Sequence, residues 1–318
     1  MMPATTSTAR PGTLEVPDAT LYYEVRGAGP LVVLVGAPMN ADAFAPLADR
    51  LAAAYTVLTT DPRGVHRSRL ADPEADSQPE QRADDLARLI SHVGAGPAAV
   101  FGSSGGAVTA LALAQAHPDL AHTVIAHEPP LIELLEDRDA LRAATEDYCA
   151  TYLAGDVLGA WRKFFRTADI AMPDEVLVQM FGGDRDARSV ADERFWFAHE
   201  LRPSTSWRPD TDLLRGGASR IVVGVGDDSA GELCDRTSRA LAAALGREPA
   251  RFPGGHIAFV DDPDAFLAPL RRVLPGHPSP DATGSAAAGS RRRRIRPHGL
   301  TTDSVSATSS KVGDTVGG

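Results

Sequence analysis

The sequence predicts an α/β protein: a mostly parallel sheet flanked by helices, with an inserted helical cap. Short apolar segments typical of buried strands alternate with segments of helical periodicity, and this alternation favours a parallel sheet. Between residues 131 and 208 the alternation stops, and this region holds all three tryptophans. We therefore expect 13–130 and 209–275 to form the sheet domain and 131–208 to form the cap.

The expected strands are the short apolar segments. Leu31–Val35 (LVVLV) is continuously apolar, as expected for a strand covered by helices on both faces. Other strands are expected at 21–25, 55–58, 98–101, 123–126, 220–225 and near 251–252. Apolar residues at helical spacing predict helices at 41–54, 81–93, 107–116, 229–245 and 264–273.

Composition limits the classes of function. The chain of 318 residues can form one large α/β domain with an insertion. A formal net charge of −10 argues against nonspecific nucleic-acid binding. No apolar run approaches the roughly 18 residues that span a bilayer. We expect a cytoplasmic enzyme acting on a small molecule, without contact to nucleic acid or membrane; the oligomeric state stays open.

The two ends of the chain are expected to lie outside the folded domain. Residues 1–12 are expected to form a flexible arm without a secretory signal. Residues 276–318 are rich in Pro, Gly, Ser, Ala and Thr and have few apolar side chains, so we expect them to be disordered. This tail contains the basic run Arg291–Arg294, which we interpret as solvated.

No metal or cofactor is expected. Cys149 and Cys234 show neither a disulfide framework nor metal-ligand spacing. The sequence also lacks the glycine-rich loops that bind nucleotides. Any chemistry should therefore come from side chains and backbone.

The segment 102–106 (Gly-Ser-Ser-Gly-Gly) indicates a nucleophile. It follows an apolar strand and precedes an alanine-rich helix, so Ser104 would be exposed on a sharp strand-to-helix turn. Glycines on either side are needed because a side chain there would collide with the neighbouring backbone. A serine hydroxyl also needs a base and donors for the developing oxyanion.

With this motif in this order of elements, the chain resembles the α/β-hydrolase superfamily over about residues 13–275. The resemblance implies a catalytic triad in the chain order nucleophile, acid, histidine. His256, in the Gly-Gly-His segment that follows the last short strand, matches the family's general base.

Two positions compete for the triad acid. The family commonly has an aspartate after the strand at 220–225, where Asp228 is the nearest candidate. Some members instead have the acid at the end of the preceding strand, where this chain has Glu128. Either could orient the histidine; we favour Glu128 slightly. Ser229 and Glu232 are interpreted as a capping box that opens the next helix.

The resemblance also implies an oxyanion hole and a supporting loop. The backbone N–H groups of Gly105 and Ala37 are the expected donors, since Pro38 has none. Residues 61–68 resemble a conserved loop of the family, in which Asp61 and Arg63 would hold neighbouring loops in place. This chain departs from the family at Val35, where relatives have histidine.

Aromatic residues of the cap are candidates for the substrate pocket. The expected pocket residues are Met39, Trp161, Phe165 and Trp196, and such a lid would favour an apolar substrate. We therefore expect a carboxylesterase-like serine hydrolase that cleaves a small ester through an acyl-enzyme on Ser104. The alternatives are a perhydrolase or haloperoxidase-like enzyme, a hydroxynitrile lyase-like enzyme, and a non-catalytic ligand-binding member of the same fold.

Overall fold

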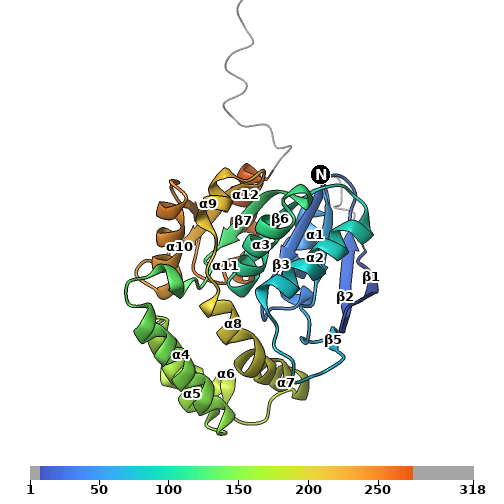
Figure 1. The fold of residues 1–318 in the computed structure, drawn as a ribbon. Coiled ribbons are helices and arrows are strands. Elements are labelled where there is room, and N and C mark those ends of the chain that lie inside the picture. Colours follow the sequence, from blue (N-terminus) through green and yellow to red (C-terminus); the bar gives the residue numbers. More distant parts are fainter. Residues whose placement is uncertain (1–7, 275–318) are drawn as a thin grey trace, which may run out of the picture. The chain divides into compact units, whose positions relative to one another are not determined.

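A nine-stranded sheet forms the centre of the molecule in the computed structural model, which describes residues 8–274 (Figure 1). Its spatial order is β1-β2-β4-β3-β6-β7-β8-β9, and β5 pairs with β2. The strands are β1 (Arg10–Val16), β2 (Ala19–Arg26), β3 (Leu31–Val35), β4 (Thr56–Thr60), β5 (Arg69–Leu70), β6 (Ala98–Ser103), β7 (Ala121–His127), β8 (Arg220–Gly226) and β9 (Ala250–Phe252).

The sheet is parallel from β4 to β9 and antiparallel at its β1–β2 edge. In the parallel part, Val33 of β3 lies opposite Leu58 on one side and Val100 on the other. Parallel strands end at the same edge of a sheet, so the loops after β3, β6, β7, β8 and β9 meet there.

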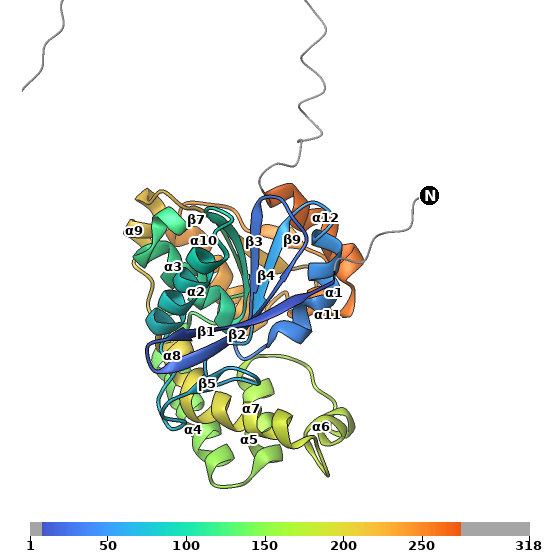
Figure 2. The same cartoon turned by 90° about the vertical axis from the view of Figure 1, so that its right-hand side faces the viewer.

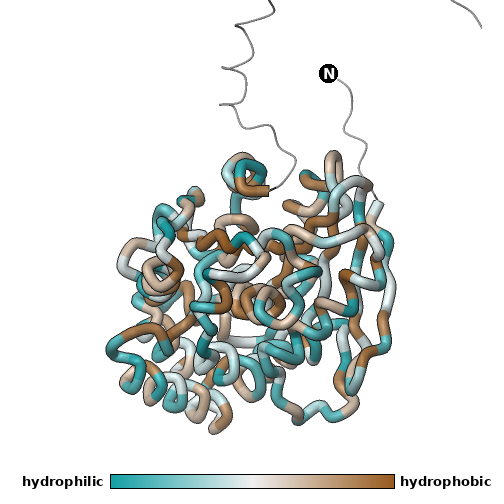
Figure 3. Tube along the Cα trace, turned by 45° about the horizontal axis from the view of Figure 1, so that its top comes forward, coloured by the Kyte–Doolittle hydropathy of each residue, from teal (hydrophilic) through white to brown (hydrophobic). Residues whose placement is uncertain are grey.

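Helices cover both faces of the sheet, which is why every residue of β3 is buried (Figure 2). Leu31, Val33 and Val35 pack in one apolar cluster with α2, α3, α9 and α10, whereas Val32 and Leu34 pack in another with α1, α11 and α12. Hydrophobic stretches of the trace run through the centre of the molecule (Figure 3). These helices are α1 (Ala41–Leu51), α2 (Pro79–Val93), α3 (Gly105–Ala116), α9 (Thr211–Gly216), α10 (Leu233–Ala244), α11 (Ala258–Asp261) and α12 (Pro263–Val273).

The chain between β7 and α9 is helical, as the sequence predicts, and forms a layer beyond the strand ends (Figures 1 and 2). The layer has its own aromatic core, in which Phe197 stacks on Tyr152 with ring centroids 4.2 Å apart. Its helices are α4 (Arg138–Leu153), α5 (Val157–Thr167), α6 (Asp174–Phe181), α7 (Ala187–Phe195), a π-helical turn (Trp196–Glu200) and α8 (Leu201–Ser206).

The structure corrects two expectations, the extent of the N-terminal arm and the start of the helix expected from Ser229, and leaves most of the arm and the tail undescribed. The flexible arm was expected to include 10–12, but Arg10–Gly12 belong to β1 and pair with Val25, Glu24 and Tyr23. The helix expected from Ser229 begins at Leu233, so Ser229 does not cap it. Most of the arm and the expected disordered tail, including Arg291–Arg294, lie outside the described residues.

None of the helices within residues 8–274 combines the length and the apolar character needed to cross a bilayer.

The backbones of α3 and β3 approach each other closely at Gly106. A Cβ atom on Gly106 would lie 2.2 Å from the carbonyl oxygen of Val35 and 2.7 Å from the Cα of Gly36. Both neighbours are backbone atoms in the sheet or its following loop, so neither can move without disturbing the sheet.

We predict that Gly106→Ala lowers the free energy of unfolding by about 1–3 kcal/mol, because overpacking forces the helix away from the sheet. Chemical denaturation of the purified variant measures this. Gly216→Ala is the matched control, since a Cβ there meets no atom within 4 Å. A Gly106→Ala variant as stable as Gly216→Ala would contradict the packing argument.

Candidate active site

Ser104 lies on a strained turn between β6 and α3. Its backbone has φ 55° and ψ −125°, which an L-residue rarely adopts and which costs about 1–3 kcal/mol. The turn is held by a hydrogen bond from the Ser104 N–H to the carbonyl oxygen of His127, 3.0 Å away. As a result, the Ser104 side chain lines a cavity at the strand ends, whereas the adjacent Ser103 is fully buried.

Glycines allow this turn to form because the backbone is crowded on both sides. A Cβ on Gly102 would lie 2.3 Å from the carbonyl oxygen of Gly106, and one on Gly105 would lie 2.7 Å from that of Ala37. The same crowding brings Gly105 next to Ala37, the two residues expected to supply oxyanion donors. Both line the cavity with Ser104.

His256 lies in the same cavity and contacts Glu128. Its Nδ1 atom is 2.7 Å from Oε2 of Glu128, whose side chain has no exposed surface. The other carboxylate oxygen of Glu128 accepts a hydrogen bond from the N–H of Gly226, 2.8 Å away. Because Nδ1 is occupied, Nε2 is the nitrogen of His256 left to exchange protons.

Glu128 reaches this position through an unusual backbone conformation. It follows β7 directly with φ 51°, and its N–H donates to the carbonyl oxygen of Gly224 at 3.1 Å. Gly226, at the end of β8, is close to the same carboxylate: a Cβ there would lie 3.1 Å from Oε1. The ends of two adjacent strands therefore build the pocket for this side chain.

The electrostatics of the pair favour a charged carboxylate. Burial alone would raise the pKa of Glu128, but the hydrogen bond and charge of His256 lower this pKa to about 2. Burial lowers the pKa of His256, yet its neighbours Cys234 and Glu128 raise it well above the ordinary value. The carboxylate thus stabilises the imidazolium that forms when the ring accepts a proton.

Asp228 and His127 have other hydrogen-bond partners. Asp228, the alternative acid, is exposed beyond β8, and its N–H donates to the carbonyl oxygen of Gly254. His127 is fully buried, with Nδ1 3.2 Å from the hydroxyl of Ser103, and burial lowers its pKa to about 4. The structure therefore brings Glu128, rather than Asp228, to His256.

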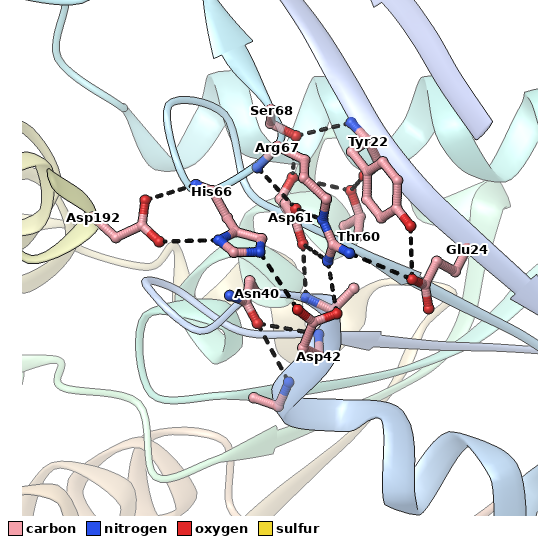
Figure 4. A network of polar contacts seen from close by, with 12 residues as sticks. Tyr22, Glu24, Asn40, Asp42, Thr60, Asp61, His66, Arg67, Ser68 and Asp192 are labelled. Atoms are coloured by element: carbon pink, nitrogen blue, oxygen red, sulfur yellow. Dashed lines mark hydrogen bonds and ion pairs between the residues drawn. The ribbon is translucent and has the colours of Figure 1, made fainter. Parts of the chain in front are cut away.

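A polar network fixes the loop that carries Ala37 (Figure 4). Buried Asp61 accepts hydrogen bonds from the N–H of Ala41 at 2.8 Å and from the backbone and guanidinium of Arg67. Asn40 caps α1 by accepting from the N–H groups of Asp42 and Ala43. Asp61 thereby holds the start of α1, and with it the preceding loop, as the sequence resemblance implied.

The same network reaches the cap. His66 donates its N–H to Asp192 of α7 at 2.8 Å, and its ring lies 3.4 Å from a carboxylate oxygen of Asp42 (Figure 4). Nearby, Arg63 forms a buried two-point ion pair with Asp85, with distances of 2.7 and 2.9 Å. Both Asp61 and Arg63 thus have structural partners.

The cavity has a volume of about 650 Å³ and mainly apolar walls. It runs from Ser104 and His256 into the cap, where aromatic rings pack against one another; Trp161 and Trp196, for example, have ring centroids 5.4 Å apart. Met39, Trp161, Phe165 and Trp196, the expected pocket residues, all line it. A cavity of this kind admits a small apolar molecule to the hydroxyl.

Sequence reasoning missed two titratable cavity residues at the start of α10. Glu232 and Cys234 line the cavity together with His256, although the sequence indicated a helix cap for Glu232 and no disulfide or metal-ligand spacing for Cys234. Both cysteines are free, and within residues 8–274 no group of three or more His, Cys, Asp and Glu side chains could hold a metal ion. A hydroxyl on a strained turn, an imidazole and a buried carboxylate are the groups that nucleophilic catalysis requires.

Comparisons with known proteins agree with this geometry. A family model described as "Alpha/beta hydrolase family" matches residues 31–268. The chain is similar to the uncharacterized hydrolase YraK of Bacillus subtilis (strain 168), with 32% identity over 274 residues that cover 83% of this chain and 95% of that protein. It is also similar to the zearalenone hydrolase of Bionectria ochroleuca, with 29% identity over 270 residues, covering 80% and 94%.

Among solved structures, the fold is similar to that of a hydrolase from Pseudomonas aeruginosa PA01. The TM-score is 0.64 at 18% sequence identity, covering 84% of this chain and 98% of the other. At this identity the likeness concerns the fold alone. The family match over most of the sheet and the whole cap, with a full-length relative above 30% identity, shows that this chain belongs to the alpha/beta hydrolase family.

Proposed function

We propose that this member of the alpha/beta hydrolase family cleaves small apolar carboxylic esters through an acyl-enzyme on Ser104. The observation that carries the proposal is the contact between His256 and buried Glu128 in the cavity that Ser104 also lines. A fully buried carboxylate that pairs with an imidazole, in a cavity that a strained serine also lines, suits acyl transfer.

In the proposed mechanism the Ser104 hydroxyl oxygen attacks the ester carbonyl carbon while Nε2 of His256 accepts its proton. The carbonyl oxygen becomes an oxyanion facing the N–H groups of Ala37 and Gly105. Collapse of this intermediate expels the alcohol, which takes the proton from His256. Water, deprotonated by His256, then attacks the acyl-enzyme and releases the carboxylic acid, restoring the serine.

The preference for an apolar substrate rests on the cavity walls. Aromatic side chains of the cap enclose the space beyond Ser104. The names of two relatives contain different substrates. One is zearalenone, and the other is 2-(acetamidomethylene)succinate, for a protein from Mesorhizobium japonicum (strain LMG 29417 / CECT 9101 / MAFF 303099) that is 35% identical over 133 residues. Since these substrates differ, the walls of this cavity are the better guide.

The first test addresses the nucleophile. We predict that a fluorophosphonate probe labels the protein and that Ser104→Ala abolishes labelling and lowers kcat for p-nitrophenyl butyrate by at least about a thousandfold. Intact-mass spectrometry and initial rates provide the measurements. The adjacent buried residue gives a matched control, Ser103→Ala, which should keep its labelling. Labelling that persists in Ser104→Ala would overturn the assignment, and tight ligand binding without turnover would favour a non-catalytic protein.

The second test addresses the acid and the pH profile. Because Cys234 and Glu128 raise the pKa of His256 and the base must be neutral, kcat/KM should rise with pH and level off only above the ordinary histidine pKa. Glu128→Gln should shift the rise in kcat/KM to lower pH and reduce the plateau value of kcat/KM by about a thousandfold or more. Asp228→Asn is the matched control and should leave the pH dependence and the plateau value of kcat/KM nearly unchanged. If Asp228→Asn lowers the plateau and Glu128→Gln does not, Asp228 is the acid.

The third test addresses the apolar cavity. For p-nitrophenyl esters from acetate to hexanoate, each methylene that enters the cavity should add about 0.8 kcal/mol of binding, or about fourfold in kcat/KM. The series should rise until the cavity is filled and then fall. If kcat/KM does not depend on the length of the acyl chain, the aromatic walls do not contact that chain.

A further inference from the structure

Apart from His256, the charged side chains on the described walls of the active-site cavity are carboxylates. Four carboxylate side chains line the cavity, and its described lining contains no lysine or arginine; the four are Asp192, Glu193, Glu232 and Asp261. Apart from His256, which pairs with Glu128, and the oxyanion donors, the lining offers a substrate carboxylate no cationic partner. The charged groups of the lining therefore distinguish neutral from anionic molecules.

Three of these carboxylates have other partners or lie at the periphery. Glu193 is paired with Arg185 at 2.6 Å and also accepts from the hydroxyl of Tyr152. Asp192 accepts from the N–H of His66 in the network that joins the loop to the cap. Asp261 is exposed. Their charges are neutralised, hydrogen-bonded or screened by water.

Glu232 differs from the other three. It is half-buried at the residue before α10, and in the part of the chain that the structure describes it forms no ion pair with a lysine or arginine. Burial, followed by the negative charge of Glu128, raises the pKa of its carboxyl group, and His256 lowers it. Glu232 lines the same cavity as His256 and Ser104.

From this placement we propose that Glu232 is a specificity-determining residue that makes the active site select neutral over anionic ester substrates. The inference rests on the proposed ester hydrolysis at Ser104. A substrate carboxylate in the cavity would face the Glu232 charge in a partly desolvated site, where like charges repel strongly. Repulsion acts only on the charged substrate, whereas any effect of Glu232 on the oxyanion acts on both substrates and cancels in their ratio.

The test uses two esters that differ only at the far end of the acyl chain. One is p-nitrophenyl hydrogen glutarate, whose free carboxylate is ionised at pH 8, and the other is its uncharged methyl ester. The full-length protein should prefer the uncharged ester. In Glu232→Gln the ratio of the two kcat/KM values should fall by about tenfold, chiefly because the anionic ester reacts faster.

Two controls separate charge from packing. Glu232→Asp retains the negative charge and should retain the discrimination. Glu175→Gln removes a charge from an exposed position on α6 and should leave the ratio as in the unmodified protein. Raising the salt concentration should reduce the discrimination of the unmodified protein more than that of Glu232→Gln.

The outcomes distinguish the two levels of the proposal. If both esters are cleaved equally well in a Ser104-dependent reaction, or if Glu232→Gln changes both rates by the same factor, the role of Glu232 is wrong and ester hydrolysis stands. If the unmodified protein cleaves neither ester, nor any ester of the acyl series, the proposed function itself is wrong and this inference falls with it.

Discussion

The close packing of α3 against the sheet is the constraint on which the rest of the site depends. Only glycine at positions 102 and 106 lets the helix start so near β3, since a Cβ at either would lie within 2.3 Å of a backbone oxygen. The sharp bend that results gives Ser104 its strained backbone and turns its side chain toward the cavity. Strain of this kind persists only where the surrounding structure determines it, and here fully buried strands on both sides do so.

The parallel sheet then brings the carboxylate and the imidazole to the same edge as Ser104, because its strands end there together. The loops after β7 and β9 are at the same edge as the Ser104 turn, and they carry Glu128 and His256. The end of β8 holds Glu128 through hydrogen bonds with Gly224 and Gly226. A buried carboxylate is costly unless it is hydrogen-bonded and paired, and the Gly226 N–H and His256 meet both conditions.

Sequence patterns predicted the parts of the fold in which burial is complete. The strand at Leu31–Val35 has the predicted bounds, and those at 98–101 and 123–126 are extended to Ala98–Ser103 and Ala121–His127, because continuous apolar runs have few alternatives in a sheet covered on both faces. The edge strand β1 was missed because its residues are mostly exposed or half-buried. Sequence patterns favoured Glu128 over Asp228 only slightly, because the positive φ that accompanies the contact of Glu128 with His256 is a backbone property that the sequence does not encode locally.

The later start of α10 explains why the sequence did not reveal Glu232. A capping box beginning at Ser229 would have turned Glu232 back toward its own helix, but the helix begins four residues later, and residues 229–232 form a turn at the cavity wall. In the proposed triad the acid follows β7, so the loop after β8 is not needed to orient the histidine. In the same proposal, the charge of Glu232 in that loop acts on the substrate, and the site distinguishes substrates by their charge.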